Sequence, residues 1–141
     1  MIVSCSNDEG SVSNTNPNSI AIVGTWKAIK AVDVCSTGSE QVFNLSSCEQ
    51  MGRTIFSENG TLVLINYTET LFNCEQSSSF NGTWFLDGEN LTITTDQTYD
   101  YSFFEVTDST LRLGDYDSSQ NLTCDGGNPL SHYYTEFEKV E

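Results

Sequence analysis

The side chains best able to do chemistry in this 141-residue sequence are its five cysteines and its single histidine. A zinc site of the usual kind needs closely spaced cysteine and histidine ligands. No two cysteines form a C-x-x-C pair, and His132 alone is too few to complete a ligand set. We therefore expect no metal site. The cysteines are then expected to form disulfides or to stay free thiols, and they are Cys5, Cys35, Cys48, Cys74 and Cys124.

One cysteine must stay outside any disulfide, because the count of five is odd. Cys5 is the candidate, since it lies outside every periodic segment and precedes the polar stretch SNDEGSVSNTNPNS. The sequence IVSC, which ends at Cys5, resembles the end of a bacterial lipoprotein signal peptide, although such peptides usually carry leucine in place of Ile2. The resemblance implies that residues 1–4 are a remnant of the signal peptide and that Cys5 carries a lipid. The alternative is an unpaired thiol in a flexible tail.

A lipid on Cys5 would locate the protein at a bacterial outer membrane, on the periplasmic or cell-surface side. The stretch SNDEG, directly after Cys5, resembles the acidic export tag of surface lipoproteins from Gram-negative bacteria. Residues 5–19 are polar and rich in turn-forming types, so we expect a flexible tether between the lipid and a folded domain. Two disulfides among the other four cysteines would agree with an oxidising compartment.

Other groupings of reactive side chains lack the spacing that their chemistry requires. The segment from Asp115 has acidic and polar residues at the intervals of a calcium loop, but Gln120 stands where that loop needs glycine and Gly126 where it needs glutamate. His132 has no serine or cysteine partner in a recognisable motif. The twenty carboxylates suit a solvated acidic surface better than an acid–base pair. We therefore expect no catalytic residues and no cofactor, and a hydrolase is the least favoured class.

The charge balance limits the partners of the chain. Twenty acidic residues against five basic ones give a net charge of −15, which repels phosphate backbones and anionic membrane surfaces. Nucleic-acid binding is thereby excluded. No apolar run approaches the roughly 20 residues of a membrane-spanning helix. A chain of 141 residues fits one domain, and we expect it to act as a monomer.

The residues from 20 onward form short β-prone runs separated by turn residues. The pair Asn59-Gly60, for example, predicts the turn of a β-hairpin. Eight or nine short strands with almost no amphipathic helix favour an antiparallel sandwich or a closed barrel. A first strand, three hairpins and a last strand are expected over residues 24–34, 54–67, 84–94, 99–116 and 132–140.

Two features resemble lipocalins and favour the barrel. The sequence GTW at 24–26 resembles the G-x-W signature at the start of lipocalins, in which glycine permits a tight turn and tryptophan caps one end of the core. The order of this GTW, Cys48, Phe56, Cys74 and a second GTW at 82–84 is similar to small lipocalin-like domains of bacterial surface lipoproteins. The resemblance implies an all-β fold: an antiparallel, up-and-down, lipocalin-like β-barrel of eight strands, or nine. Its structural residues here would be Gly24, Trp26 and Gly82.

The barrel is expected over residues 20–141. The resemblance implies a disulfide between Cys48 and Cys74. Cys35 and Cys124 are additions to the family pattern, and they would then form the second disulfide. Four cysteines permit three connectivities, so other pairings stay open.

A basic side chain from a late strand often stacks over the first tryptophan of a lipocalin. Arg112 and Lys139 are the candidates for this role. We prefer Lys139, because it belongs to the last strand.

An eight-stranded barrel either fills with its own side chains or holds one small ligand. Strand alternation places Tyr99, Tyr101 and Phe103 on one face, and together with Trp84 they are the candidate ligand-binding residues. The other interior residues expected are Phe56, Leu62, Leu64, Leu91, Ile93, Tyr133 and Phe137. Residue types alone do not separate an apolar pocket from a packed core.

The function expected is that of a non-catalytic surface lipoprotein that binds a small apolar or amphipathic ligand. The alternative is a protein- or glycan-interaction accessory domain of an outer-membrane assembly, with a solid barrel core. An exposed aromatic patch near residues 115–128 would favour this alternative, because large exposed apolar patches mark contacts.

Overall fold

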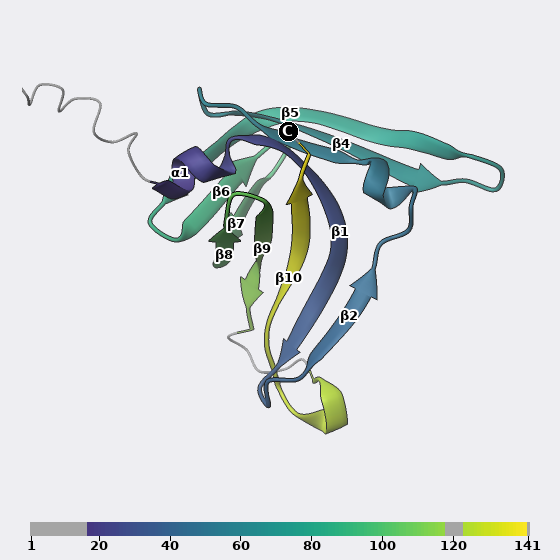
Figure 1. Cartoon of the computed structure of the whole chain (residues 1–141), viewed down its shortest axis with the longest axis vertical. Helices are drawn as coiled ribbons and strands as arrows, with labels where there is room; N and C mark the ends of the chain where they lie inside the picture. Colours follow the sequence, from purple (N-terminus) through teal and green to yellow (C-terminus); the bar gives the residue numbers. More distant parts are fainter. Residues whose placement is uncertain (1–16, 118–122, 141) are drawn as a thin grey trace, which may run out of the picture.

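The structure, a computed structural model, describes residues 17–117 and 123–140 of the chain. This part is almost entirely β-structure, with one short α-helix and two 3-10 turns (Figure 1). Within it, no helix is long and apolar enough to cross a membrane. In chain order the elements are α1 (Pro17–Ile22), β1 (Gly24–Cys35), β2 (Glu40–Asn44), η2 (Glu49–Met51), β3 (Arg53–Phe56), β4 (Thr61–Glu69), β5 (Cys74–Asp87), β6 (Asn90–Thr94), β7 (Thr98–Tyr101), β8 (Phe103–Val106), β9 (Thr110–Tyr116), η3 (Asp125–Gly127) and β10 (Leu130–Lys139).

The ten strands of the described part form one antiparallel sheet in the order β7-β6-β5-β4-β3-β1-β10-β9-β8, with β2 paired to β1 alone. Chain neighbours pair throughout the hairpins β3/β4, β5/β6 and β8/β9, as the turn signals predict. The all-β, up-and-down architecture is therefore confirmed. The strand that the sequence did not predict is β2, whose five side chains are all exposed and so lack a buried alternating pattern.

The structure differs from a closed barrel at one corner. The run expected as one strand over 99–106 bends at Ser102 and is divided into β7 and β8, which do not pair with each other in the described sheet. Tyr101 pairs with Leu91 of β6 before the bend, whereas Phe103 pairs with Gly114 of β9 after it. The hydrogen-bonded path therefore ends at β7 and β8, and the two ends of the sheet are joined by the chain through the bend.

Asp115 of β9 holds this bend. Its Oδ1 accepts hydrogen bonds from the backbone N–H of Ser102 at 2.9 Å and from the hydroxyl of Ser102 at 3.1 Å. The bend inserts one extra residue, as a β-bulge does, so the alternation of side chains between the two faces of the sheet is shifted by one residue after Ser102. Tyr101 and Phe104 consequently pack against the main core, while Phe103 packs on the other face of the sheet. The expectation that Phe103 shares a face with Tyr101 is wrong for this reason.

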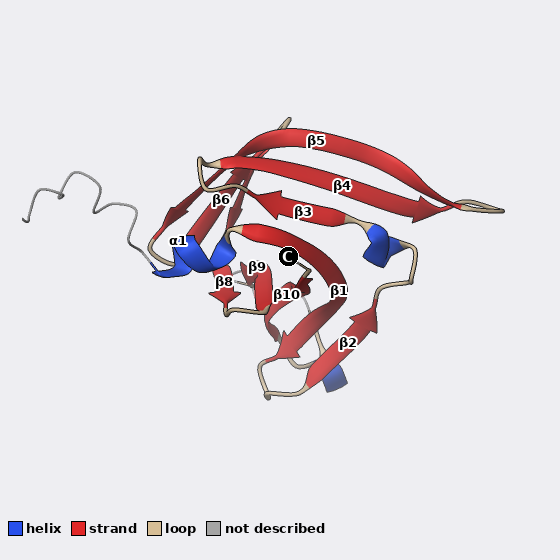
Figure 2. Cartoon of the chain, turned by 45° about the horizontal axis from the view of Figure 1, so that its top comes forward, coloured by secondary structure: helices blue, strands red, loops and turns tan. Residues whose placement is uncertain are grey.

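The main core fills the end of the barrel at which β1 begins. Helix α1 lies across this end (Figure 2), and its Ile22 is fully buried. Pro17 suits the first turn of the helix, where a backbone N–H is not needed. The last three residues of the expected tether, 17–19, thus belong to α1. The buried core residues are Ile22, Trp26, Phe56, Leu62, Leu91, Ile93, Leu111 and Leu113.

Trp26, which is fully buried, is held from two sides. Its indole Nε1 donates a hydrogen bond to the carbonyl oxygen of Ile22 at 2.8 Å. Lys139 Nζ lies 5.3 Å from the centroid of the Trp26 ring and donates to the carbonyl oxygen of Ala21 at 3.4 Å. The stacking expected of Lys139 is confirmed, whereas the Arg112 guanidinium lies over another ring.

The two GTW sequences need glycine because of the conformation and the close packing of the backbone at these positions. Gly24 has a φ of 143°, a conformation that residues with a side chain rarely adopt. At Gly82 of β5, a Cβ would clash with the carbonyl oxygen of Thr94 on β6. Glycine therefore permits the entry into β1 and the close approach of β5 to β6.

A smaller cluster of Val32, Phe103 and Tyr134 is buried on the other face of the sheet. The rings of Phe103 and Tyr134 stack with their centroids 5.4 Å apart, on either side of Gly114. Tyr133, which was expected in the interior, is 39% exposed, and Tyr134 is the buried tyrosine of β10.

Both expected disulfides are present. Cys48–Cys74 joins the turn η2 to the start of β5, and Cys35–Cys124 joins the end of β1 to the segment before β10. The Cα atoms of the pairs lie 5.5 Å and 5.6 Å apart, as disulfide geometry requires. Cys5 lies outside the described residues.

Candidate functional site

A cavity of about 280 Å³ lies at the end of the barrel remote from α1. Leu64 follows Leu62 along β4, and Leu113 follows Leu111 along β9, so the alternation that fills the core continues into the cavity. The apolar lining residues are Leu64, Phe80, Ile93, Leu113 and Phe137. The polar lining residues are Thr54, Asn66, Thr95, Asp96, Tyr99 and Tyr101. The cavity therefore combines an apolar floor on the main core with a polar rim.

Two tyrosines of β7 place hydroxyl groups at this rim. Tyr99 is 43% exposed, whereas Tyr101 is half-buried against the core. Within the described part of the chain, neither hydroxyl has a protein hydrogen-bond partner. Burial, together with the nearby negative charge of Asp115, raises the pKa of Tyr101 above its ordinary value. At neutral pH the Tyr101 hydroxyl is consequently protonated and can donate a hydrogen bond.

The structure places the four residues predicted as the ligand site at three different locations. Tyr99 and Tyr101 line the cavity. Trp84 lies nearer the α1 end, where its indole Nε1 donates to the carbonyl oxygen of Ser57 at 2.9 Å. It lines a separate open groove of about 450 Å³ beside α1. Phe103 lies on the other face of the sheet, stacked on His132 with 4.5 Å between the ring centroids.

Several cavity residues were missed by reasoning from the sequence. Phe80 lies on the same side of β5 as Gly82 and Trp84, so alternation along that strand could have identified it. Thr54 and Asn66 carry no such signal, because polar residues inside a barrel look like exposed strand residues in the sequence. Asp96 belongs to the turn between β6 and β7, and only the fold brings it to the cavity.

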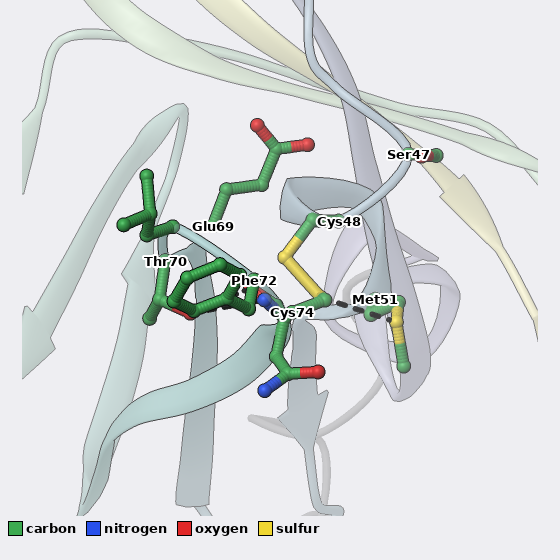
Figure 3. Close-up of a pocket in the computed structure, with 9 residues that line it drawn as sticks. Ser47, Cys48, Met51, Glu69, Thr70, Phe72 and Cys74 are labelled. Atoms are coloured by element: carbon green, nitrogen blue, oxygen red, sulfur yellow. Dashed lines mark hydrogen bonds between the residues drawn. A yellow bond between two sulfur atoms is a disulfide. The ribbon is translucent and has the colours of Figure 1, made fainter.

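A third hollow, of about 430 Å³, lies beside the Cys48–Cys74 disulfide at the tip of the β4/β5 hairpin (Figure 3). Leu71 and Phe72 at this tip are 87% and 85% exposed. The turn that carries them is closed by a hydrogen bond from the Thr70 backbone N–H to the Asn73 carbonyl oxygen at 2.7 Å. The structure thus presents two large apolar side chains on a tight turn.

The outer face of the sheet carries an aromatic row next to an ion-pair network. His132 packs against Phe103 and Tyr116, which also contact each other, and the Arg112 guanidinium lies 4.9 Å from the centroid of Tyr134. Arg112 also pairs with Glu136 at 2.9 Å and with Glu105 at 3.3 Å. Burial lowers the pKa of His132 below its ordinary value. Tyr116 is the exposed member of the row, at 56%.

No group of three histidine, cysteine, aspartate or glutamate side chains in residues 17–117 and 123–140 could hold a metal ion. In the described part, His132 Nδ1 lies 3.1 Å from the hydroxyl of Ser131, the adjacent residue of β10. The chemistry that the described part supports best is binding.

Comparison with known proteins gives one family match. A family model described as a lipocalin-like domain matches residues 22–113. No curated protein has a significant match to the chain. In structure, the chain is similar to a lipocalin-like protein from Bacteroides uniformis ATCC 8492, with 14% identity and a TM-score of 0.52, over 85% of this chain and 99% of the other. It is also similar to an uncharacterized protein from Bacteroides eggerthii DSM 20697, with 14% identity and a TM-score of 0.50, over 84% and 98% of the two chains.

Proposed function

Because the chain belongs to the lipocalin-like domain family, we propose that it is a binding module that takes one small apolar or amphipathic ligand in the cavity at the open end of its barrel. Lipocalin-like domains are generally binding folds without catalytic activity. The observation that carries the proposal is the cavity itself, with its apolar floor and with the free hydroxyls of Tyr99 and Tyr101 at the rim. A ligand there would bury its apolar part on Leu113 and Phe137 and its polar part near the tyrosines.

The test is binding of a neutral apolar probe, N-phenyl-1-naphthylamine, followed by its fluorescence. We expect one site per chain. Leu64→Phe adds volume inside the cavity and should weaken binding at least fivefold. Val63→Phe makes a similar change on the opposite side of β4, outside the cavity, and should leave binding unchanged. Absence of binding to the unmodified protein, or equal losses in two folded variants, would contradict the proposal.

We also propose that Cys5 carries a lipid that anchors the domain to a bacterial outer membrane. The sequence IVSC and the polar stretch after it support this proposal. The test is production behind a complete lipoprotein signal peptide in a Gram-negative bacterium, with Cys5→Ser as the control. We expect the unmodified protein in the membrane fraction with the mass of an acylated N-terminus, and the variant in the soluble fraction. The same fractionation for both proteins would refute the anchor.

A second candidate function is contact with a protein partner through the hairpin tip of Leu71 and Phe72. Exposed apolar side chains on a stiff turn can enter a pocket of a partner with little loss of entropy. The neighbouring Glu69 and Glu75 oppose an anionic lipid surface, so a protein pocket is the better match.

This contact can be tested with a photo-crosslinking residue at position 72 in cells that carry the anchored protein. A single crosslinked protein that is lost with Leu71→Ser would support the contact. Position 85, also an exposed phenylalanine, serves as the control. Equal crosslinking from both positions would show that the tip has no specific partner.

A further inference from the structure

The charged groups around the cavity are all of one sign. Among the described residues that line it, Asp96 is the one charged residue, and its Oδ1 accepts a hydrogen bond from the hydroxyl of Thr95 at 2.9 Å. Asp115 lies next to this end of β7, because its Oδ1 accepts hydrogen bonds from Ser102, the residue after Tyr101, although Asp115 itself does not line the cavity. A ligand head group at the rim therefore meets the negative charge of Asp96, with Asp115 as a second carboxylate outside the lining.

Every basic residue of the chain lies elsewhere. The sequence has five lysines and arginines, and none of them lines the cavity. Arg112 and Lys30 pair with Glu136 on the outer face, with distances of 2.9 Å and 3.7 Å. Lys139 lies over Trp26 at the α1 end. No lysine or arginine is thus placed to receive a carboxylate or a phosphate in the cavity.

The two remaining basic residues, Arg53 and Lys27, also lie away from the cavity lining. Arg53 Nη1 donates to the carbonyl oxygens of Gln50 and Gly52 at 2.9 Å and 2.7 Å. Lys27 of β1 lies opposite Glu138 of β10. The negative potential at the cavity is consequently not balanced by any basic side chain that lines it.

Aromatic rings complete the rim. Tyr99 and Tyr101 of β7 and Phe80 of β5 line the same cavity as Asp96. The faces of aromatic rings attract cations, and this attraction strengthens where the cation loses water. A carboxylate together with several rings is a combination that suits an alkylammonium group, whereas a carboxylate ligand would meet neutral hydrogen-bond donors at the rim but no cationic side chain.

We infer that the cavity selects its ligand by head-group charge: it takes a small amphiphile with an alkylammonium head group at Asp96 and the tyrosines, and it discriminates against the same chain with a carboxylate. This inference rests on the proposed function, because it assumes that the cavity binds a ligand. It adds the ligand class and assigns the selection to Asp96.

The test compares three probes that share an eight-carbon chain: octyltrimethylammonium, 1-octanol and octanoate. Each displaces N-phenyl-1-naphthylamine from the protein at low ionic strength. We expect the ammonium probe to bind at least tenfold more tightly than octanoate, with octanol between them. Added salt should narrow the difference, since a rim carboxylate is partly screened.

Two variants that each remove one negative charge test whether Asp96 causes the preference for the ammonium probe. Asp96→Asn should bring the ammonium and carboxylate affinities to within about threefold of each other, with octanol binding unchanged. Asp100→Asn is the matched control, because Asp100 lies on β7 between Tyr99 and Tyr101 but faces away from the cavity, where it accepts a hydrogen bond from the Thr92 hydroxyl at 2.8 Å. It should leave the preference intact.

The outcomes separate the two proposals. If neither N-phenyl-1-naphthylamine nor any of the three probes binds, the proposed function fails and the inference fails with it. If octanol binds but octanoate equals or exceeds the ammonium probe, the cavity is a ligand site and the charge selection is overturned. Equal effects of Asp96→Asn and Asp100→Asn would assign the preference to the overall negative charge and overturn the role of Asp96.

Discussion

At the scale of single residues, Lys139 and Trp26 show how one contact closes the end of the barrel. The ammonium group lies over the indole ring and also reaches the backbone of α1 at Ala21, so it links β10, β1 and α1. A cation over a buried ring contributes more than one at the surface, because water competes less for the charge.

We expect Lys139→Met to lower the free energy of unfolding by about 1 kcal/mol, since methionine keeps the aliphatic packing and loses the charge. Urea denaturation measures the change. Lys27→Met is the control, because it removes the same charge from β1 without touching Trp26 and should cost clearly less. A Lys139→Met protein as stable as the control would show that the stacking contributes nothing.

His132 leads to a prediction about pH. Its pKa is lowered first by burial and further by Arg112, while Glu40 and Glu105 act in the opposite direction. The folded protein thus favours neutral His132, and the unfolded chain binds its proton more readily. The stabilising contribution is complete above the ordinary pKa of about 6.5 and is lost as the pH falls through the lower pKa of the folded state.

Unfolding measured at pH 7.5 and pH 5.5 should therefore show a larger loss of stability for the unmodified protein than for His132→Gln. A direct NMR titration of the imidazole should give a pKa below the ordinary value. The opposite result, a His132 pKa above it, would mean that Glu40 and Glu105 outweigh burial.

The candidate site shows what a residue pattern can and cannot predict. Alternation along the strand correctly placed Tyr99 and Tyr101 together. The same rule failed for Phe103, because the bend at Ser102 adds a residue and reverses the faces after it. The bend depends on Asp115, which lies thirteen residues after Ser102 in the chain, so the residues around Ser102 do not predict it.

At the scale of elements, the corner between β7 and β8 depends on this single carboxylate. Asp115→Ala removes the acceptor of two hydrogen bonds from Ser102, and we expect a loss of about 1–3 kcal/mol in the free energy of unfolding. Amide hydrogen exchange at Ser102 should also become faster. Asp108→Ala, in the turn between β8 and β9, is the control for the loss of a charge. Unchanged exchange at Ser102 would contradict the role assigned to Asp115.

The two disulfides differ in the length of chain that they close. Cys35–Cys124 spans 89 residues and Cys48–Cys74 spans 26, so their removal should cost about 4.6 and about 3.5 kcal/mol in chain entropy. Paired replacement of each disulfide by alanines, followed by denaturant unfolding, tests this order. A greater loss from the shorter loop would show that local packing around η2 outweighs chain entropy.

At the scale of the whole molecule, the net charge of −15 opposes the compact state. The three ion pairs between described residues all lie on one outer face, among Lys30, Glu105, Arg112 and Glu136, and cannot balance it. We expect the free energy of unfolding to rise as sodium chloride increases from 20 to 300 mM, because screening weakens the repulsion. A triple variant, Glu58→Gln, Asp87→Asn and Glu89→Gln, should respond less to salt. A fall in stability with salt would instead give the ion pairs the greater weight.

The sequence alone determined most of the strands, the hairpin turns, the glycines of the two GTW sequences and, through its resemblance to lipocalins, the pairing of Cys48 with Cys74. These depend on local alternation, on turn chemistry and on motif order, all of which are visible along the chain. The tertiary structure alone decided that Asp96 and Asn66 meet the tyrosines of β7 at one cavity, that every basic side chain lies outside it, and that β7 and β8 part at Ser102. These features arise from contacts between distant strands, and a linear pattern carries no information on how far a sheet curls before its ends meet.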